Sequence, residues 1–134
     1  MRSRGFGILS VACLVCFGPA KGQDTDGSGE LEYLYGCAGC HGVFGEGDGP
    51  AGPMLNIQPP DLTGISARNG GSFPFLEMVQ IIDGRGEALH PGIMPVWGDR
   101  LGAEFGELYG PYGGELMIRG RIMSLVRFLE TIQQ

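Results

Sequence analysis

Apolar residues recur at helical spacing in three separate segments of the chain, and this pattern predicts three helices. The first is expected over residues 28–36, the second over residues 74–83, and the last over residues 115–132. The stripes that define them are, in chain order, Gly29, Tyr33 and Cys37; Phe75, Met78, Val79 and Ile82; and Ile118, Ile122, Leu125, Val126 and Leu129. No segment alternates apolar and polar residues over the length of a strand, so the pattern predicts an all-α protein.

The segments between the expected helices are rich in glycine and proline, and residues 42–64 and 84–114 are therefore predicted to be long loops. Loops of this length are uncommon in a small domain unless they cover something. Gly84 stands where the second helix is expected to stop. Gly120 lies inside the last expected helix, at a cost of about 1 kcal/mol relative to alanine. A close crossing with the first helix near Gly29 is one explanation for this glycine.

The N-terminal residues have the pattern of a secretory signal peptide over residues 1–22. Two arginines precede an apolar run over residues 6–17, and residues 20–22 (Ala-Lys-Gly) supply the small residues of a cleavage site. We expect cleavage after Gly22, which leaves residues 23–134 as the mature domain. The apolar run is shorter than the ~20 residues that cross a bilayer as a helix, so no membrane span is expected after cleavage. An uncleaved signal that acts as a membrane anchor is the alternative.

The mature chain is strongly acidic. All fifteen acidic residues follow Gly22, but only six of the nine basic residues do, which gives a net charge of −9. Such a surface repels nucleic acid and anionic lipid, so neither is an expected partner. The acidity has two interpretations: it keeps the protein soluble, or it directs docking onto basic or apolar surfaces of a partner protein.

Cys37, Cys40 and His41 have the Cys-x-x-Cys-His spacing that attaches haem covalently. Each thiol can form a thioether with one vinyl group of the haem, and His41 then binds the iron as its proximal ligand. The alternatives are a redox-active thiol pair and half of a zinc site. A closed zinc site needs four N or S ligands, but the remaining cysteines, Cys13 and Cys16, lie in the segment expected to be removed. A thioredoxin-like pair would need a βαβ pattern around it, which this sequence lacks.

The second axial position of the iron determines what such a protein can do. Met94 lies 53 residues after His41, in irregular chain just before Pro95, where a rigid loop can direct its thioether at the iron. We expect Met94 to be the distal ligand, with His90 as the alternative. Among the other methionines, Met54 is too close to the attachment motif in sequence, and Met78, Met117 and Met123 are interpreted as core side chains. With nitrogen and sulfur on its two faces, the iron has no site for oxygen or peroxide, and its reduction potential is raised.

Six motifs follow one another along the chain: Cys37-x-x-Cys40-His41, Gly52-Pro53-x-Leu55, Pro60-Asp61-Leu62, Ile82-Asp83-Gly84-Arg85, Met94-Pro95, and Leu125-Val126-x-Phe128-Leu129. Together they resemble a class I cytochrome c, and are most similar to bacterial single-haem domains with a Met-Pro distal loop. The resemblance covers residues 27–132. It implies the cytochrome c fold, in which three main helices and long loops wrap around one covalently attached haem c. It also implies that the first and last helices cross and that Met94 is the distal ligand.

The resemblance further implies which residues surround the haem. In this family a proline carbonyl accepts the Nδ1 proton of the proximal histidine, which fixes the ring and raises its basicity. The Gly-Pro-x-Leu motif assigns that role to Pro53, with Pro50 as the alternative. Arg85 and Trp97 are candidates to hydrogen-bond the haem propionates. The alternative for Trp97 is packing against the haem edge, and for Arg85 it is ordinary solvation.

The function that the resemblance implies is electron transport rather than catalysis. We expect an exported, periplasmic cytochrome c of a bacterium that carries one electron between redox protein partners. One alternative is a haem-bearing electron-transfer subunit of a larger dehydrogenase or oxidase complex. Residues 98–114, which depart from the short family pattern, would then be buried in an interface. A second alternative is a haem enzyme or gas sensor with an open distal site.

Overall fold

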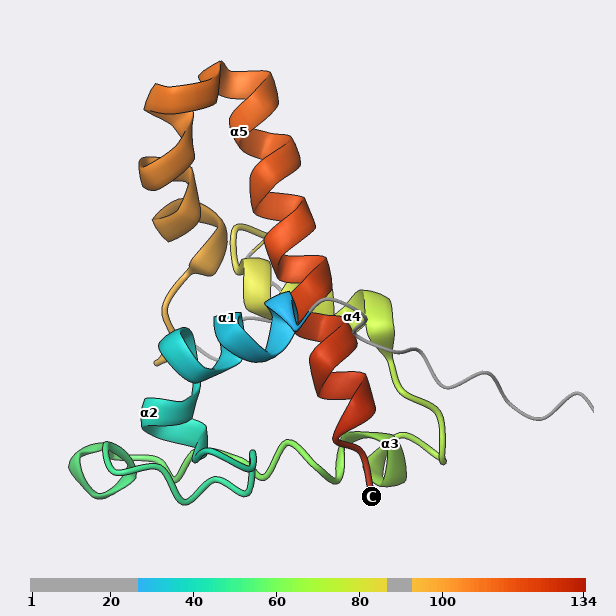
Figure 1. Ribbon diagram of the computed structural model, residues 1–134. Coiled ribbons are helices and arrows are strands. Elements are labelled where there is room, and N and C mark those ends of the chain that lie inside the picture. The colour runs from blue at the N-terminus through green and yellow to red at the C-terminus, as the bar shows by residue number, and fades with distance from the viewer. Residues whose placement is uncertain (1–26, 87–92) are drawn as a thin grey trace, which may run out of the picture.

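The computed structural model describes residues 27–86 and 93–134 (Figure 1). The expected signal peptide and the alternative ligand His90 lie outside the described residues. The helices, in chain order, are α1 (Ser28–Gly36), α2 (Ala38–His41), a 3₁₀ turn η1 (Gly52–Met54), α3 (Ile65–Arg68), α4 (Phe75–Asp83) and α5 (Trp97–Thr131). The described residues form no strand, so the structure is all-α, as the sequence predicts.

The first and last helices pack against each other, as the sequence predicts. Tyr33 of α1 is fully buried, and its ring lies 5.2 Å from the ring of Phe128 on α5. The apolar stripe predicted for the last helix is buried throughout, and it forms most of the core together with Tyr33. At the edge of this contact the Arg121 guanidinium donates to the carboxylate of Glu32, which ties α5 to α1.

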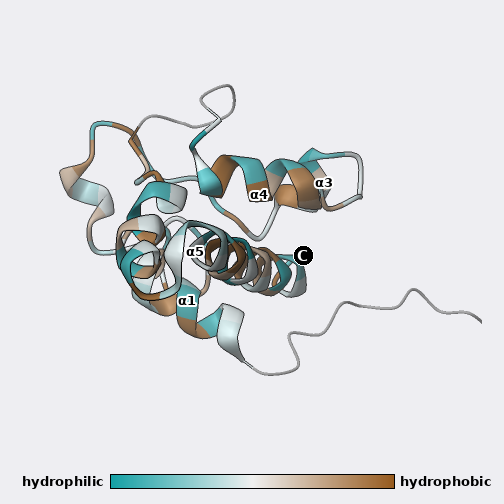
Figure 2. Ribbon diagram, turned by 90° about the horizontal axis from the view of Figure 1, so that it is seen from above, coloured by the Kyte–Doolittle hydropathy of each residue, from teal (hydrophilic) through white to brown (hydrophobic). Residues whose placement is uncertain are grey.

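Helix α4 packs on another side of α5 and completes the core. In Figure 2, α5 is seen nearly end-on, with α4 and α3 on one side of it and α1 on the other. Gly84 ends α4 in a left-handed conformation, with φ of 72°, and its N–H donates to the carbonyl of Gln80. A residue with a Cβ is strained at such a φ, so this glycine is the helix stop that the sequence predicts.

Helix α5 differs from the prediction, because residues 97–109 are helical rather than part of a loop. The prediction of a loop over residues 84–114 is therefore wrong for residues 97–109, and the last helix begins after Gly110, a few residues before the expected Glu115. Non-helical backbone at Gly110, followed by Pro111, divides α5 into a first arm (residues 97–109) and a second arm (residues 111–131). Figure 1 shows the two arms side by side, as a helical hairpin that rises away from α2 and α4.

Closely packed glycines explain the hairpin. Glycine recurs every four residues along the first arm, at positions 98, 102, 106 and 110, and this spacing places a smooth stripe on one face of a helix. The second arm comes so close that a Cβ on Gly114 would lie 3.3 Å from the Cα of Gly106. Packing between the arms thus outweighs the low helix propensity of glycine. The close approach depends on Gly114: a Cβ on Gly106 or Gly110 would meet nothing within 4 Å, and one on Gly98 would meet Arg85 and Asp83, so the four-residue spacing itself does not come from contact between the arms.

Three side-chain positions on the second arm also differ from expectation. A Cβ on Gly120 would meet nothing within 4 Å, so a close crossing with α1 does not explain this glycine. Met117 and Met123 are 40 % and 48 % exposed, so they are not core side chains. Both lie on the side of the second arm that faces solvent, away from the buried stripe of Ile118 to Leu129.

Candidate functional site

Cys37 joins α1 to α2, and Cys40 and His41 lie in α2; we call residues 37–41 the attachment turn. The Cys37 N–H donates to the carbonyl of Tyr33 as the last bond of α1, and the Cys37 carbonyl then accepts from the N–H groups of Cys40 and His41. This short α-helical turn places the second thiol and the imidazole three and four positions after the first thiol. Side chains at these offsets lie on one face of a helix. The sequence motif therefore forms a single cluster of two thiols and one imidazole.

The loop that follows the motif doubles back and runs along it. The N–H groups of Gly47, Gly49 and Ala51 donate in turn to the carbonyls of His41, Cys40 and Gly39, at 2.8, 3.2 and 2.9 Å. A Cβ on Gly49 would lie 2.5 Å from the carbonyl of Cys40, so only glycine allows this approach. Backbone hydrogen bonds from this loop thus hold the attachment turn on its outer side.

Tyr33 supports the turn from the inside. Its hydroxyl donates to the carbonyl of Gly42, the residue after His41, at 2.5 Å. Burial raises the pKa of the Tyr33 hydroxyl to about 12, and the charges of Cys37 and Asp48 add to this effect. The hydroxyl therefore stays protonated at neutral pH and remains a donor. Tyr33 thus packs between α1 and α5 and also holds the residue that follows His41.

The imidazole of His41 is oriented by a backbone carbonyl. Its Nδ1 lies 3.1 Å from the carbonyl oxygen of Pro60. Because a carbonyl oxygen can only accept, Nδ1 carries the proton in this arrangement, and Nε2 is left with the lone pair that binds a metal. This is the bond that the sequence assigned to Pro53, with Pro50 as the alternative, and that assignment is corrected to Pro60.

Long-range bonds decide which proline carbonyl reaches His41. Residues 47–51 are bonded along the attachment turn, and the exposed Pro53 lies in the 3₁₀ turn η1 that follows them. The chain returns to His41 only at Pro60. There the Leu62 N–H donates to the Gly45 carbonyl at 2.6 Å, and the Thr63 N–H and hydroxyl both donate to the Asp61 carboxylate at 2.7 Å.

The attachment turn forms one wall of a cavity of about 350 Å³, which is far larger than a single water molecule needs. Most of its lining is apolar and comes from every part of the fold. The lining residues are Gly36, Cys37, Cys40, His41, Leu55, Pro59, Pro60, Leu62, Ile65, Arg68, Met78, Ile81, Ile82, Ile93, Met94, Pro95, Trp97 and Leu129. The predicted anchors Cys37 and Cys40, the predicted ligands His41 and Met94, and Trp97 thus line the same cavity. A large, apolar space beside two thiols and one imidazole fits a flat macrocycle bound through iron.

Two methionines line this cavity rather than one. Met94 comes from the loop before α5, and Met78 comes from the inner side of α4. The sequence pattern predicts Met78 only as a core side chain, but its place on the apolar stripe of α4 puts it on the side that faces the centre of the fold. Met54 is 79 % exposed and is not among the described residues that line the cavity. Among the described methionines, only Met78 and Met94 line the cavity, and Met94 as the distal ligand stays a prediction.

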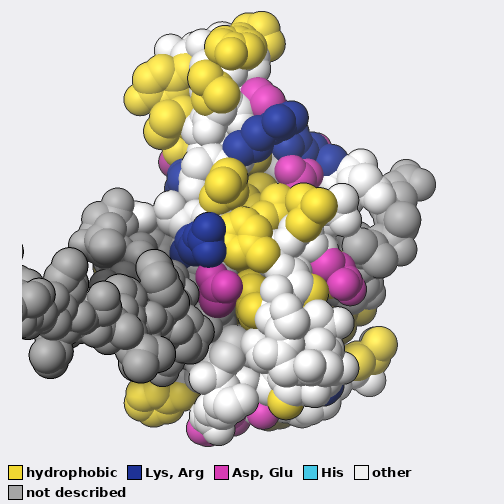
Figure 3. Space-filling view, turned by 90° about the vertical axis from the view of Figure 1, so that its right-hand side faces the viewer, with side chains coloured by type: hydrophobic (Ala, Val, Ile, Leu, Met, Phe, Trp, Pro, Cys, Tyr) yellow, Lys and Arg dark blue, Asp and Glu magenta, His cyan; other side chains and the backbone are white. Residues whose placement is uncertain are grey.

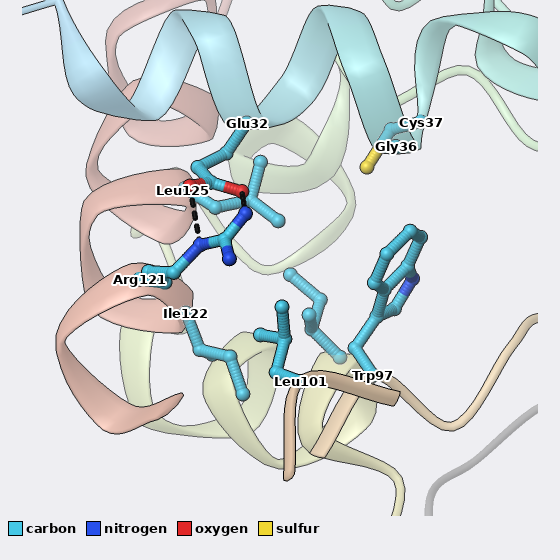
Figure 4. Close-up of a pocket in the computed structure, with 9 residues that line it drawn as sticks. Glu32, Gly36, Cys37, Trp97, Leu101, Arg121, Ile122 and Leu125 are labelled. Carbon is cyan, nitrogen blue, oxygen red and sulfur yellow. Dashed lines mark hydrogen bonds and ion pairs between the residues drawn. The ribbon is translucent and has the colours of Figure 1, made fainter. Parts of the chain in front are cut away.

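Trp97 stands at the start of the hairpin, beside the first cysteine. A Cβ on Gly36 would lie 2.8 Å from the Trp97 ring, so the indole packs directly on the backbone of α1. Figure 4 shows the indole near Gly36 and Cys37, with the Glu32–Arg121 ion pair bridging α1 and α5 on the other side of this small pocket. The position of Trp97 agrees with packing against a haem edge, and its bond to a propionate stays a prediction.

Arg85 is not among the described residues that line the large cavity. Its guanidinium donates to the carboxylates of Asp83 and Glu115, at 2.6 and 2.8 Å, and lies against the backbone of Gly98. Two carboxylates already hold this guanidinium, and the contact between Arg85 and a propionate stays a prediction. The arginine at the cavity is Arg68, which the sequence analysis did not single out; its Nη2 donates to the Asp61 carbonyl at 2.6 Å.

The thiol chemistry of the site disfavours the other interpretations of the motif. Burial raises the pKa of the Cys37 thiol to about 12, and the charges of Glu32 and Cys40 add to this effect. A free thiol in this position would stay protonated, whereas redox exchange uses the thiolate. In the part of the chain that the structure describes, three or more His, Cys, Asp or Glu side chains nowhere gather as a metal site.

Comparison with known proteins gives one match. A family model described as "Cytochrome c" matches residues 29–101, which is more than half of the chain. The match implies a covalently bound haem c and haem-based electron transfer. No curated protein and no solved structure matches the chain. Among the described residues, none of the helices combines the length and the apolar character that a membrane span requires.

Proposed function

Because this chain belongs to the cytochrome c family, we propose that it is an exported electron carrier with a single covalently attached haem, which moves one electron at a time between redox protein partners. The observation that supports this most directly is that Cys37, Cys40 and His41 line the same cavity as Met94. Three of these side chains come from one turn, and the fourth comes from a loop 53 positions after His41. The fold thus brings together the groups that attachment and axial ligation require.

Bound in this cavity, the haem would supply an iron that gains and loses one electron as it cycles between Fe(II) and Fe(III). The residues of the chain hold and shield that group. Cys37 and Cys40 anchor it through thioethers, and His41 presents Nε2 to the metal while its Nδ1–H donates to Pro60. This hydrogen bond fixes the ring and makes it a stronger ligand. The apolar walls exclude water, which raises the reduction potential, as a methionine ligand also does.

Met94 is the proposed distal ligand, and Met78 is part of the apolar wall. Met94 lies in non-helical chain next to Pro95, where the backbone can direct a thioether, whereas Met78 is fixed within α4 one turn before the buried Ile82. Filling both axial positions leaves no coordination site for a substrate or a gas. The proposed protein is therefore a carrier rather than an enzyme.

Carbon monoxide binding to the haem-loaded mature protein tests this assignment. We expect the reduced wild type to bind carbon monoxide poorly at neutral pH, and Met94→Leu to bind it readily and to lose the weak sulfur-to-iron charge-transfer band of the oxidised protein. Met78→Leu is the matched control and should keep that band. The assignment would be contradicted if the reduced wild type bound carbon monoxide readily, or if the charge-transfer band were lost in Met78→Leu but kept in Met94→Leu. An intact mass without the increment of one haem would contradict the function itself.

The proposed location is the periplasm, which the signal pattern of residues 1–22 supports. The partners are redox proteins, and the acidity of the mature chain favours partners that present basic or apolar surfaces. The second candidate is an electron-transfer subunit of a larger oxidoreductase complex, which the exposed hairpin of residues 97–131 favours. Native purification from periplasm, followed by mass spectrometry of any protein that co-elutes at fixed stoichiometry, distinguishes the two.

A further inference from the structure

The top of the α5 hairpin exposes a cluster of large apolar side chains. Leu108, Tyr109, Tyr112 and Leu116 are 72 %, 56 %, 78 % and 55 % exposed, and we call these four residues the hairpin apex. They come from both arms, on either side of Gly110. Figure 3 shows hydrophobic side chains gathered at this end of the molecule. Single exposed apolar residues are normal on a protein surface, but a cluster on a projecting element indicates an interaction site.

The two arms pack closely just below the apex. A Cβ on Gly113 would lie 2.9 Å from the Cβ of Tyr109, and one on Gly114 would lie 3.3 Å from the backbone of Gly106. Gly113 therefore leaves room for the side chain of Tyr109, and Gly114 lets the backbones of the two arms approach each other. The ring of Tyr109 lies 6.2 Å from that of Phe105, which supports it from below. The apex is thus a fixed surface, and little entropy is lost when it is covered.

The charge around the apex favours contact with a like surface. Residues 108–114 carry no charge, although the whole chain has a net charge of −6. The nearest carboxylate on the second arm, Glu115, is paired with Arg85 and Arg119 at 2.8 and 2.6 Å. On the first arm, Glu107 directly precedes Leu108, is exposed and forms no ion pair among the described residues, so a two-fold contact has to leave this carboxylate in solvent. The remaining acidic residues stay at the rim, where solvent and salt screen their repulsion.

The area of the apex agrees with a contact between two copies. With ~200 Å² for each large side chain and the exposures given above, the apex offers on the order of 500 Å² of mostly apolar surface. Two apices together then contribute on the order of 1,000 Å², which is near the lower limit for a specific interface. Tyrosine and leucine are suited to such a contact, because they add apolar area with few rotatable bonds.

We propose that the hairpin apex is a homodimer contact, through which two copies of this chain associate by a two-fold axis, apex against apex. Both arms contribute to the surface, so the same patch serves on each copy, as an isologous contact requires. The first arm is 13 residues long, which places the apex about 18 Å from Trp97 at the edge of the cavity. The dimer therefore leaves both cavities free to meet redox partners. This contact is independent of the electron-transfer function proposed above.

Sedimentation velocity of the haem-loaded mature protein, detected by haem absorbance, tests the proposal. We expect the wild type to change from monomer to dimer between about 1 μM and about 300 μM, in the range of a weak specific contact. Leu108→Glu and, separately, Tyr112→Glu should raise the dissociation constant at least tenfold, because each places a charge in the apolar contact. Leu76→Glu is the matched control: Leu76 is 68 % exposed on α4, and this change should leave the dimer intact.

Several outcomes would overturn the proposal. A wild type that stays monomeric over the whole range, or apex variants that dimerise as well as the wild type, would do so. Equal loss of the dimer in Leu76→Glu would show a general effect of added charge. A monomeric wild type that binds neutral phosphatidylcholine vesicles, or a different protein at fixed stoichiometry, would assign the apex to another occupant. An unchanged Soret spectrum and melting temperature must accompany each variant, and two separate apex variants guard against failure of one to fold.

Discussion

Replacing Gly49 by alanine should specifically damage the attachment turn. A Cβ at this position would lie 2.5 Å from the carbonyl carbon and oxygen of Cys40 and 2.6 Å from the oxygen of Gly39, whereas ordinary contacts begin at 3.4 Å. The loop must therefore withdraw by roughly 1 Å from backbone that cannot yield. Gly49 is not at positive φ, so the cost is steric and does not come from a disfavoured backbone conformation.

The withdrawal breaks or weakens two hydrogen bonds, Gly49 N–H to Cys40 at 3.2 Å and Ala51 N–H to Gly39 at 2.9 Å. Each contributes about 1 kcal/mol, and residual overpacking adds about 1–3 kcal/mol. Alanine returns about 0.5–1 kcal/mol by restricting the unfolded chain. We therefore expect Gly49→Ala to lower the free energy of unfolding by about 3 kcal/mol.

Urea titration of the haem-loaded protein measures this change, with the fluorescence of Trp97 as the probe. Trp97 is the sole tryptophan and lines the cavity, so its emission should rise when the fold opens. Gly39→Ala is the matched control in the same turn, because a Cβ there meets nothing within 4 Å. It should leave stability unchanged or raise it by up to about 1 kcal/mol. If Gly49→Ala unfolds at the wild-type urea concentration, or if Gly39→Ala loses as much stability, the close approach does not support the turn.

Three further changes test other parts of the structure. Gly120→Ala should raise the melting temperature through about 1 kcal/mol of helix propensity, since its Cβ meets open space; a lower melting temperature would show a contact with α1 after all. Tyr33→Phe should cost about 1–2 kcal/mol in urea titration, because the carbonyl of Gly42 loses its donor, and an unchanged midpoint would contradict that bond. Arg85 and a second arginine lower the pKa of Glu115 from 4.5 to about 2, so its ion pairs stabilise the fold above about pH 4.5, and this is lost as the pH falls towards 2. In Glu115→Gln the free energy of unfolding should therefore fall less between pH 4.5 and pH 2 than in the wild type, by a difference of less than about 1 kcal/mol. A variant whose stability falls as steeply as that of the wild type would contradict a stabilising role of these ion pairs.

Local patterns in the sequence carried most of the information about the attachment site. Two thiols and an imidazole at offsets of three and four residues share one helical face wherever the chain is helical, so their grouping needs no long-range contact. The helices around Tyr33 and Ile82, and the stripe from Ile118 to Leu129, follow from apolar spacing in the same way. The left-handed stop at Gly84 is equally local, because it depends on one residue without a Cβ.

Other features depend on contacts between distant residues, and only the tertiary structure decided them. Pro60 rather than Pro53 reaches His41, because backbone bonds first hold residues 47–51 along the attachment turn. The guanidinium of Arg85 donates to Glu115, thirty positions later, and Arg85 is not among the described residues that line the cavity. The first arm of the hairpin is helical although its glycines disfavour a helix, and its backbone at Gly106 is in close contact with Gly114 of the second arm.

The attachment motif and the helical class can therefore be predicted from short stretches of sequence, since both arise from groups a few positions apart. The tertiary structure decided which carbonyl, which arginine and which thioethers lie at the cavity, and how residues 97–131 fold back on themselves. The physical reason is that each of these choices is a competition between partners far apart in the chain. Its outcome depends on close packing and hydrogen-bond geometry, which no short window of residues contains.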